Sequence, residues 1–306
     1  MAPPKRRPTG FVRGRVALPE IFVLSLRPMF RLYATDHALY LEHDGATVRP
    51  GPEFTVDALF EATDPVALAT AAYASGHQAQ LPNPAAGLAT VIGRQEVWAA
   101  GVTYLRSKSA RVAESRDAGG GTFYDRVYEA ERPELFFKAT PHRVVPSGGG
   151  VRIRSDSRWN VPEPELTLAV NRHGRIFGFT IGNDMSSRDI EGENPLYLPQ
   201  AKVYDRCAAV GPCLVITDDL PAPTTVIAIE ILRGGAQVFS GQTTLASLKR
   251  PLPSLAGWLY RDNSFPSGCY LMTGTGVVPP DTFTLQQGDE IRITLDPVGT
   301  LVNTVL

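Results

Sequence analysis

The sequence predicts an α+β protein in which β-strands dominate and which has two unequal parts. Short apolar runs alternate with Gly and Pro turns over most of residues 135 to 296, a pattern typical of strands and not of long helices. Residues 53 to 75 instead have the apolar spacing of a helix, with a break at Pro65. The 306 residues are enough for one large domain or two smaller ones. No segment repeats at a fixed period.

The first part is expected to be a small α/β lobe over residues 1 to 87. Short apolar runs at 17 to 42 lead into a turn-like HDGA sequence and then into the helix-like segment. A stretch rich in Pro, Gly and Ala follows and ends where the strand-like EVWAAGVTY begins. Because Pro and Gly interrupt regular elements, we place a boundary near residue 87. Residues 88 to 306 then form the second, β-dominated part, with two or more packed sheets.

Residues 106 to 131 within the second part are predicted to form a mobile lid. Two polar, helix-like stretches flank the triple glycine at 119 to 121, and glycine gives a connecting segment conformational freedom. A solvated surface excursion with a flexible connector explains this composition equally well. A second triplet at 148 to 150 is predicted to be a turn, because neither triplet stands between a strand and a helix with phosphate-loop spacing.

The charge balance and the cysteines restrict the class of partner. Lys and Arg total 30 against 31 Asp and Glu, so the net charge attracts neither nucleic acid nor an anionic membrane, and a small molecule is the expected partner. No apolar run approaches the roughly 20 residues of a membrane span. The basic, Pro-rich start has no apolar core of a signal peptide, which favours a cytoplasmic protein with a frayed tail. The cysteines are expected to be reduced core residues: Cys207, Cys213 and Cys269.

The segment from 160 to 184 is predicted to be a β-hairpin that carries a carboxylate cluster. If Asn171 pairs with Gly174 across the turn, Glu165 lies opposite Thr180 and Glu163 opposite Gly182, with Asp184 diagonally beside Glu163. Side chains alternate along a strand, so all these positions share one face, and Gly182 leaves space among the acids.

Three carboxylates on one face of a sheet repel each other unless a cation or solvent offsets the repulsion. A hydrated acidic strand edge is the usual explanation for an isolated Glu-x-Glu. Here the acids flank strongly apolar strands, which favours a bound cation. Oxygen ligands select Mg²⁺, Mn²⁺ or Ca²⁺ over zinc, so Glu163, Glu165 and Asp184 are the predicted metal ligands.

The same region resembles the fumarylacetoacetate hydrolase family. Its motifs are an E-x-E pair, an N-D-x-S-x-R-D segment, K-x-x-D and G-P. They correspond here to Glu163 and Glu165, to Asn183, Asp184, Ser186, Arg188 and Asp189, to Lys202 and Asp205, and to Gly211 and Pro212. The resemblance extends from about residue 95 to the end of the chain. It implies a mixed β-roll catalytic domain, a homodimer or dimer of dimers, Mg²⁺ on the three acids, and chemistry on 2-oxo acids through a metal-bound enolate.

One departure from the family pattern favours a particular branch. The family's hydrolases carry a His and a Glu at the third and sixth positions after the Tyr of an N-Y pair. This chain has Thr103 and Tyr104 there, followed by Ser107 and Ala110, so no imidazole is present to activate water. The surrounding sequence instead resembles the 2-dehydro-3-deoxy-D-arabinonate (2-keto-3-deoxypentonate) dehydratase branch. We therefore expect a hydro-lyase that forms 2,5-dioxopentanoate and water from the sugar acid.

Residue roles follow from this reaction. Lys202 is the candidate base, because a neighbouring cation and partial burial both favour a neutral amine; alternatively it stays protonated and pairs with the substrate or Glu163. Glu114 on the lid and Glu191 are candidates for the acid that protonates the departing hydroxyl. Arg188 is expected to bind the substrate carboxylate or brace the acids, with a surface ion pair as the ordinary alternative. The substrate-binding candidates are Arg106, Ser107, Lys138, Arg188 and Thr275.

Two other functions stay open at this point. A carbon-carbon hydrolase of acylpyruvates would keep the metal site but needs a water-activating base. A metal-binding protein without catalysis would keep the acids and place no demand on Lys202. His142 and His173 are expected to take no part, and Thr275 has the alternative of a structural turn residue.

Overall fold

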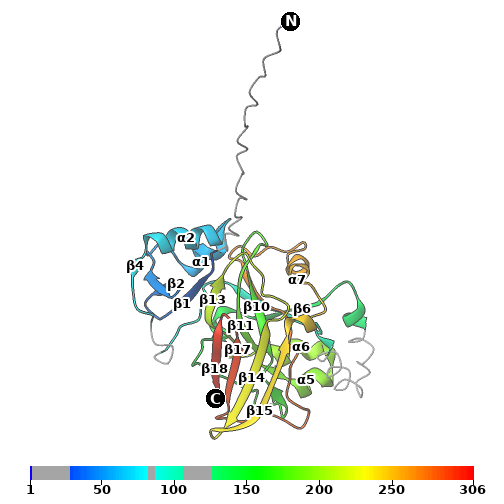
Figure 1. The fold of residues 1–306 in the computed structure, drawn as a ribbon. Coiled ribbons are helices and arrows are strands. Elements are labelled where there is room, and N and C mark those ends of the chain that lie inside the picture. The colour runs from blue at the N-terminus through cyan, green and yellow to red at the C-terminus, as the bar shows by residue number, and fades with distance from the viewer. Residues whose placement is uncertain (2–27, 82–86, 106–125) are drawn as a thin grey trace.

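The computed structural model describes residue 1 and residues 28 to 81, 87 to 105 and 126 to 306. Within these ranges the chain folds into three sheets and a few short helices, which confirms the β-dominated α+β class. Figure 1 shows the small lobe, with α1 and α2, beside the much larger strand-rich part. No helix in the described ranges is long and apolar enough to cross a membrane.

The largest sheet has eleven strands in the described part of the chain. In spatial order they are β4 (His77–Gln78), β3 (Ala46–Arg49), β2 (Leu39–His43), β1 (Phe30–Ala34), β13 (Ala208–Ile216), β11 (Ile176–Asp184), β10 (Pro164–Val170), β16 (Cys269–Met272), β5 (Glu96–Gly101) and β6 (Glu134–Ala139), with β7 (Val144–Val145) paired to β13. Because β1 pairs with β13, strands from both sides of residue 87 belong to one sheet. The division into two domains at residue 87 stays a prediction.

Two smaller sheets complete the strands. The five-stranded sheet contains, in spatial order, β15 (Ala236–Thr244), β14 (Val226–Arg233), β17 (Glu290–Leu295), β18 (Gly299–Val305) and β8 (Gly150–Val151). The two-stranded sheet pairs β9 (Asn160–Val161) with β12 (Ser186–Ser187). The helices that lie wholly within the described ranges are α1 (Val56–Glu61), α2 (Pro65–Ser75), α5 (Arg188–Glu193), α6 (Leu198–Lys202) and α7 (Leu252–Leu259), with 3₁₀ turns at Pro141–Arg143, Pro195–Tyr197 and Leu245–Ser247.

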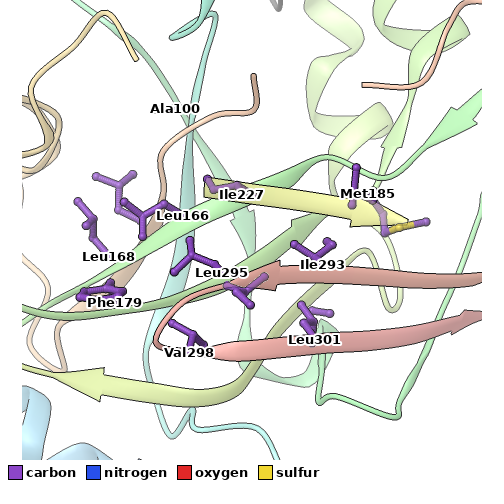
Figure 2. Close-up of a cluster of buried hydrophobic side chains, with 14 of the residues drawn as sticks. Ala100, Leu166, Leu168, Phe179, Met185, Ile227, Ile293, Leu295, Val298 and Leu301 are labelled. Atoms are coloured by element: carbon purple, nitrogen blue, oxygen red, sulfur yellow. The ribbon is translucent and has the colours of Figure 1, made fainter. Parts of the chain in front are cut away.

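The main core lies between the eleven-stranded and five-stranded sheets. Leu166 and Leu168 of β10 point into it, together with Ile293 and Leu295 of β17 and Leu301 of β18 (Figure 2). All five side chains are at most 1% exposed. Since side chains alternate along a strand, Glu165 and Thr167 of β10 must face the opposite side of the large sheet. The apolar side chains on one face of β10 therefore anchor the strand that carries Glu165 on its other face.

A second core covers part of that opposite face. It includes Leu59 and Phe60 of α1, Val66 and Ala69 of α2, and Ala169 of β10. The side chain of Thr55 caps α1, and that of Asp64 caps α2, which begins at Pro65. The predicted helical segment with a break at Pro65 is thus confirmed, and Cys207, Cys213 and Cys269 are buried as predicted.

Candidate metal centre

The three predicted acids meet at the end of the β10–β11 hairpin. Glu163 and Asp184 lie directly opposite each other and exchange two backbone hydrogen bonds, of 3.2 and 3.0 Å. Glu165 pairs with Gly182, where a Cβ would overlap the side chains of Thr167 and Met272. Each acid offers a carboxylate oxygen within 4.8 Å of those of the others, and all three residues are buried. The missing side chain of Gly182 therefore leaves room for Thr167 and Met272. That it also leaves space among the acids stays a prediction.

The predicted register was wrong by two residues, although the predicted face was right. Glu165 was expected opposite Thr180, but Thr180 pairs with Thr167. The turn extends to Arg175, and Phe177 forms a bulge, because Val170 pairs with Ile176 while Ala169 pairs with Gly178. One additional turn residue and one bulge residue shift the pairing by two positions. An even shift keeps every side chain on its face.

Two buried lysines contact the acid cluster. Lys202, the last residue of α6, places its Nζ 2.6 Å from Glu163 Oε2, 3.0 Å from Asp184 Oδ2 and 3.3 Å from Glu191 Oε1. It also donates a hydrogen bond of 2.5 Å to Ser186 Oγ. The contact with Glu163 is the one expected if Lys202 stays protonated. Its role as a base stays a prediction.

Lys138 on β6 supports the cluster from another side. Its Nζ lies 2.5 Å from Asp184 Oδ1 and donates to the backbone oxygens of Met185 and Lys202 at 2.9 and 2.5 Å. An ammonium group has three donors; two of them bind the backbone oxygens, and the contact with Asp184 Oδ1 is an ion pair. The geometry therefore favours support of Asp184 over the substrate contact expected from the sequence.

Arg188 and Glu191 reach the cluster from the short helix α5. Arg188 Nη1 donates to Glu163 Oε1 at 2.6 Å, and its Nε lies 3.7 Å from Glu191 Oε2. Both residues are buried, with 3% and 1% of their surface exposed. Asp189 ties the start of this helix to the loop before β9 by accepting from Ser157 Oγ and Arg158 N. Arg188 is therefore buried and paired with an acid of the cluster, so it does not form a surface ion pair. Its contact with the substrate carboxylate stays a prediction.

Counted over the described residues, and with every carboxyl group ionised, the charges of this site do not balance. Among the described residues, four buried carboxylates, Glu163, Glu165, Asp184 and Glu191, face three cations, Lys138, Arg188 and Lys202. Burial, followed by the charges of Asp184 and Glu163, raises the pKa of Glu165 well above its usual value. Its Oε2 accepts a hydrogen bond of 2.6 Å from the Gly274 amide. An excess of buried negative charge with oxygen donors is the environment that a hard divalent cation suits.

Several predicted residues lie outside this cluster or outside the described ranges. Thr275 donates to the backbone oxygen of Val277 at 2.9 Å, so its geometry is that of the structural turn residue. His142 and His173 are exposed. The lid candidates fall largely on residues that the structure does not describe; these are Arg106, Ser107, Glu114 and the glycines at 119 to 121. Of the lid segment, residues 126 to 129 are described and helical.

Sequence reasoning assigned no role to two groups that complete the site. Ser186 accepts from Lys202 and donates to the Asp184 backbone oxygen at 3.1 Å. The Gly274 amide binds Glu165 from the turn after β16. Ser186 stands inside the N-D-x-S-x-R-D motif, which was a usable signal. The Gly274 amide left no comparable signal in the sequence, because every residue except proline has a backbone N–H.

Comparison with known proteins agrees with this geometry. Residues 97 to 306 match the family described as "Fumarylacetoacetate (FAA) hydrolase C-terminal". Over 215 residues the chain is 47% identical to a probable 2-keto-3-deoxyxylonate dehydratase of Haloferax volcanii, covering 70% of this chain and 73% of the relative. It is 42% identical over 213 residues to a 2-dehydro-3-deoxy-D-arabinonate dehydratase of Saccharolobus solfataricus, covering 69% and 71%.

A solved structure is similar over most of the chain. It is a 2-keto-3-deoxy-D-arabinonate dehydratase complexed with magnesium and 2,5-dioxopentanoate, with a TM-score of 0.76 and 32% identity over 91% of this chain and 98% of that one. A fumarylacetoacetate hydrolase from Exiguobacterium antarcticum has a TM-score of 0.64 at 20% identity over 91% and 99%. This second likeness concerns the fold alone.

Proposed function

This chain belongs to the fumarylacetoacetate hydrolase family, and from that premise we propose that it is a divalent-metal-dependent dehydratase of 2-keto-3-deoxypentonates. The reaction would convert a 2-dehydro-3-deoxypentonate into 2,5-dioxopentanoate and water. The observation that carries the proposal is the position of Lys202, which lies between Glu163 and Glu191 inside the buried acid cluster. A base and an acid in one buried site are what removal of water from a sugar acid requires.

Glu163, Glu165 and Asp184 would hold the cation. A divalent cation such as Mg²⁺ held there would supply Lewis-acid chemistry, in that it would polarise a 2-oxo acid and stabilise the negative charge that develops on it. The excess carboxylate and the raised pKa of Glu165 support this ligand set. Mn²⁺ and Ca²⁺ offer the same preference for oxygen ligands and are the alternatives.

Lys202 would take the proton from C3. Its ammonium pairs with Glu163 and Asp184, and the same two acids would serve as metal ligands. A cation bound by Glu163 and Asp184 would neutralise part of their charge and weaken their ion pairs with the Lys202 ammonium. Burial would then favour the neutral amine. With 1% of its surface exposed, Lys202 has the desolvated position that this change requires.

Glu191 is the better-supported acid for the departing C4 hydroxyl. Its carboxyl group, which would take up the proton that the Lys202 ammonium gives up, is buried, lies 3.3 Å from Lys202 and is positioned by Arg188. Loss of the C3 proton and the C4 hydroxyl forms the C3–C4 double bond and one water molecule. Transfer of a proton from C5 to C3 then gives an enol, and transfer of the C5 hydroxyl proton to C4 gives the aldehyde. Glu114 is the alternative acid, and it lies outside the described residues.

The dehydratase is favoured over an acylpyruvate hydrolase because a hydrolase must generate hydroxide. Ser107 and Ala110 stand where the family's hydrolases carry His and Glu. Within the described residues, His142 and His173 are exposed and do not contribute to the cluster. A dehydratase needs only proton removal and proton delivery.

The test is direct incubation with candidate substrates. Purified protein with Mg²⁺ is mixed with 2-keto-3-deoxy-arabinonate, its stereoisomers and a set of acylpyruvates, and 2,5-dioxopentanoate is detected by aldehyde trapping. We expect aldehyde from at least one sugar acid and deuterium at the reprotonated carbons in D₂O. Rapid cleavage of acylpyruvates without dehydration would establish the hydrolase instead. No turnover of either class would favour the non-catalytic metal-binding protein.

A cytoplasmic homodimer or dimer of dimers is the expected assembly. Sedimentation equilibrium of the purified chain tests the subunit number. A monomer that is active at all concentrations would contradict it.

A further inference from the structure

The turn that binds Glu165 is held in place by Thr103, which follows strand β5. Strands β5 and β16 run parallel, with Ala99 beside Met272. Beyond these strands, residues 102 to 104 and residues 273 to 276 continue side by side. Thr103 Oγ1 donates a hydrogen bond of 2.7 Å to the Thr273 backbone oxygen. This bond joins two segments that are 170 residues apart in the sequence.

Thr273 fixes the near end of the turn on β10. Its amide and its hydroxyl both donate to the Leu166 backbone oxygen, at 3.0 and 2.9 Å. Leu166 directly follows Glu165, so the turn is attached to the strand that carries the carboxylate. The attachment fixes one point of the turn and leaves the direction of the following peptide to other contacts.

Thr103 supplies the second constraint at the next peptide. Gly274 has a φ of +92°, and a Cβ there would overlap Thr103 Oγ1. The Thr103 side chain therefore packs against the residue whose amide binds Glu165 Oε2 at 2.6 Å. Thr103 is 0% exposed, and its own backbone oxygen accepts from Lys249 N at 3.0 Å. It is held from both sides.

The backbone before Thr103 is strained in a way that serves this contact. Val102 has a φ of +52°, a region that β-branched residues rarely adopt. The side chain of Val102 is buried, with 4% exposed. A β-branched residue keeps such a conformation only where the surroundings impose it. Here the conformation of Val102 sets the direction of the chain between the end of β5 and Thr103.

We propose that Thr103 is a positioning residue for Glu165, in that its hydroxyl fixes the turn at Thr273 and thereby holds the Gly274 amide on the carboxylate. The inference rests on the proposed metal site, because the orientation of Glu165 matters for a cation. A ligand carboxylate held by one donor keeps its remaining oxygen in a fixed direction. Loss of such outer support lowers metal affinity by about 10- to 100-fold in metalloproteins.

The experiment replaces the hydroxyl without changing the shape of the side chain. Mn²⁺ is titrated into metal-free, full-length Thr103→Val protein, and free Mn²⁺ is read by electron paramagnetic resonance. We expect the Kd for Mn²⁺ to rise about tenfold over that of the unmodified chain. Thr103→Ser, which keeps the donor, should restore the Kd to within about threefold. Turnover should show a higher metal requirement in Thr103→Val, with kcat at saturating metal changed much less.

A matched control is Thr180→Val. Thr180 is 1% exposed and donates to the Cys213 backbone oxygen at 2.7 Å, so it loses an equivalent buried hydrogen bond. This bond lies on the β13 side of β11 and supports no carboxylate. The control should unfold at a similarly lower denaturant concentration and should bind Mn²⁺ as the unmodified chain does.

Several results would overturn the proposal. An unchanged Kd in folded Thr103→Val, or equal weakening in folded Thr103→Ser, contradicts it. If Thr103→Val does not fold, Thr103→Ala is measured in its place, and its Kd for Mn²⁺ should rise by the same factor. A chain that binds no Mn²⁺ removes both the metal site and this inference. A chain that dehydrates no sugar acid but shows the serine-rescued loss of Mn²⁺ affinity refutes the proposed function and leaves the role of Thr103 standing.

Discussion

Two fully buried carboxylates of this protein have opposite surroundings. Asp289 accepts from Arg233 Nε at 2.7 Å and Nη2 at 2.8 Å, and from the Gln286 amide at 2.9 Å. One cation thus matches one carboxylate. Glu165 lies beside two other acids, its Oε2 accepts from the Gly274 amide, and among the described residues it makes no ion pair.

The comparison separates a structural charge from a functional one. A buried carboxylate with a bidentate arginine is satisfied within the chain. A buried group of acids with an incomplete set of cations is costly unless something else supplies positive charge. Burial alone would have ranked Asp289 and Glu165 alike, since they are 0% and 1% exposed. The balance of charge distinguishes them.

The largest effect is expected at Lys202, the cation shared by three of the acids. Lys202→Ala should lower kcat for dehydration by about 10³-fold, because it removes the proposed base. Binding of Mg²⁺, followed by isothermal titration calorimetry, should persist since Glu163, Glu165 and Asp184 remain. Lys202→Arg serves as the control, because it keeps the positive charge but cannot act as a base at neutral pH. An active arginine variant would mean that Lys202 only balances charge.

The next effect sharpens the contrast between the two carboxylates. Glu165→Gln should weaken Mg²⁺ binding by about 100-fold, through loss of a charged ligand. The metal-free variant should unfold at an equal or higher urea concentration than the unmodified chain, because the mutation relieves repulsion. Metal titration and urea unfolding are measured on the same preparation. An unchanged Mg²⁺ titration would place the metal elsewhere.

Asp289→Asn should have the reverse pattern. It leaves the Arg233 guanidinium without its charged partner and should lower the free energy of unfolding by about 2 kcal/mol. The loss is smaller than for a fully buried ion pair, because solvent reaches the arginine, whose side chain is 33% exposed. Mg²⁺ affinity should stay the same, as measured by the same calorimetric titration. If Asp289→Asn is as stable as the unmodified chain, the ion pair between Arg233 and Asp289 contributes no more to the free energy of unfolding than the acid cluster does.

The smallest effect is a dependence on pH. Because the folded pKa of Glu165 lies above its unfolded value, its contribution stabilises the metal-free protein at low pH and is lost as pH rises through the folded pKa. A bound cation favours the ionised form. The Tm difference between Mg²⁺-loaded and metal-free protein should therefore widen with increasing pH, as followed by calorimetry. In Glu165→Gln this widening should shrink; an unchanged slope would assign it to another group.

The sequence was sufficient for the acids and insufficient for their supports. Alternation of side chains places Glu163, Glu165 and Asp184 on one face in any register shifted by an even number of residues. The additional turn residue and the bulge at Phe177 together shift the pairing by two, so they left that prediction intact. The donors of Lys138 could not be assigned, because two of them bind backbone oxygens brought close only by the fold. The support from Thr103 depends on parallel pairing of distant strands, which periodicity does not encode.

The pairing of β1 with β13 has a consequence for anyone who wishes to shorten the chain. All nine residues of β13 are buried, and β1 covers part of one of its hydrogen-bonding edges from Leu214 to Ile216. A fragment beginning near residue 97, where the family match starts, would lack β1 and expose those unpaired peptide groups beside an apolar surface. Such an edge is a template for pairing between molecules. We therefore expect the family segment alone to self-associate through this edge, which β1 covers in the full chain.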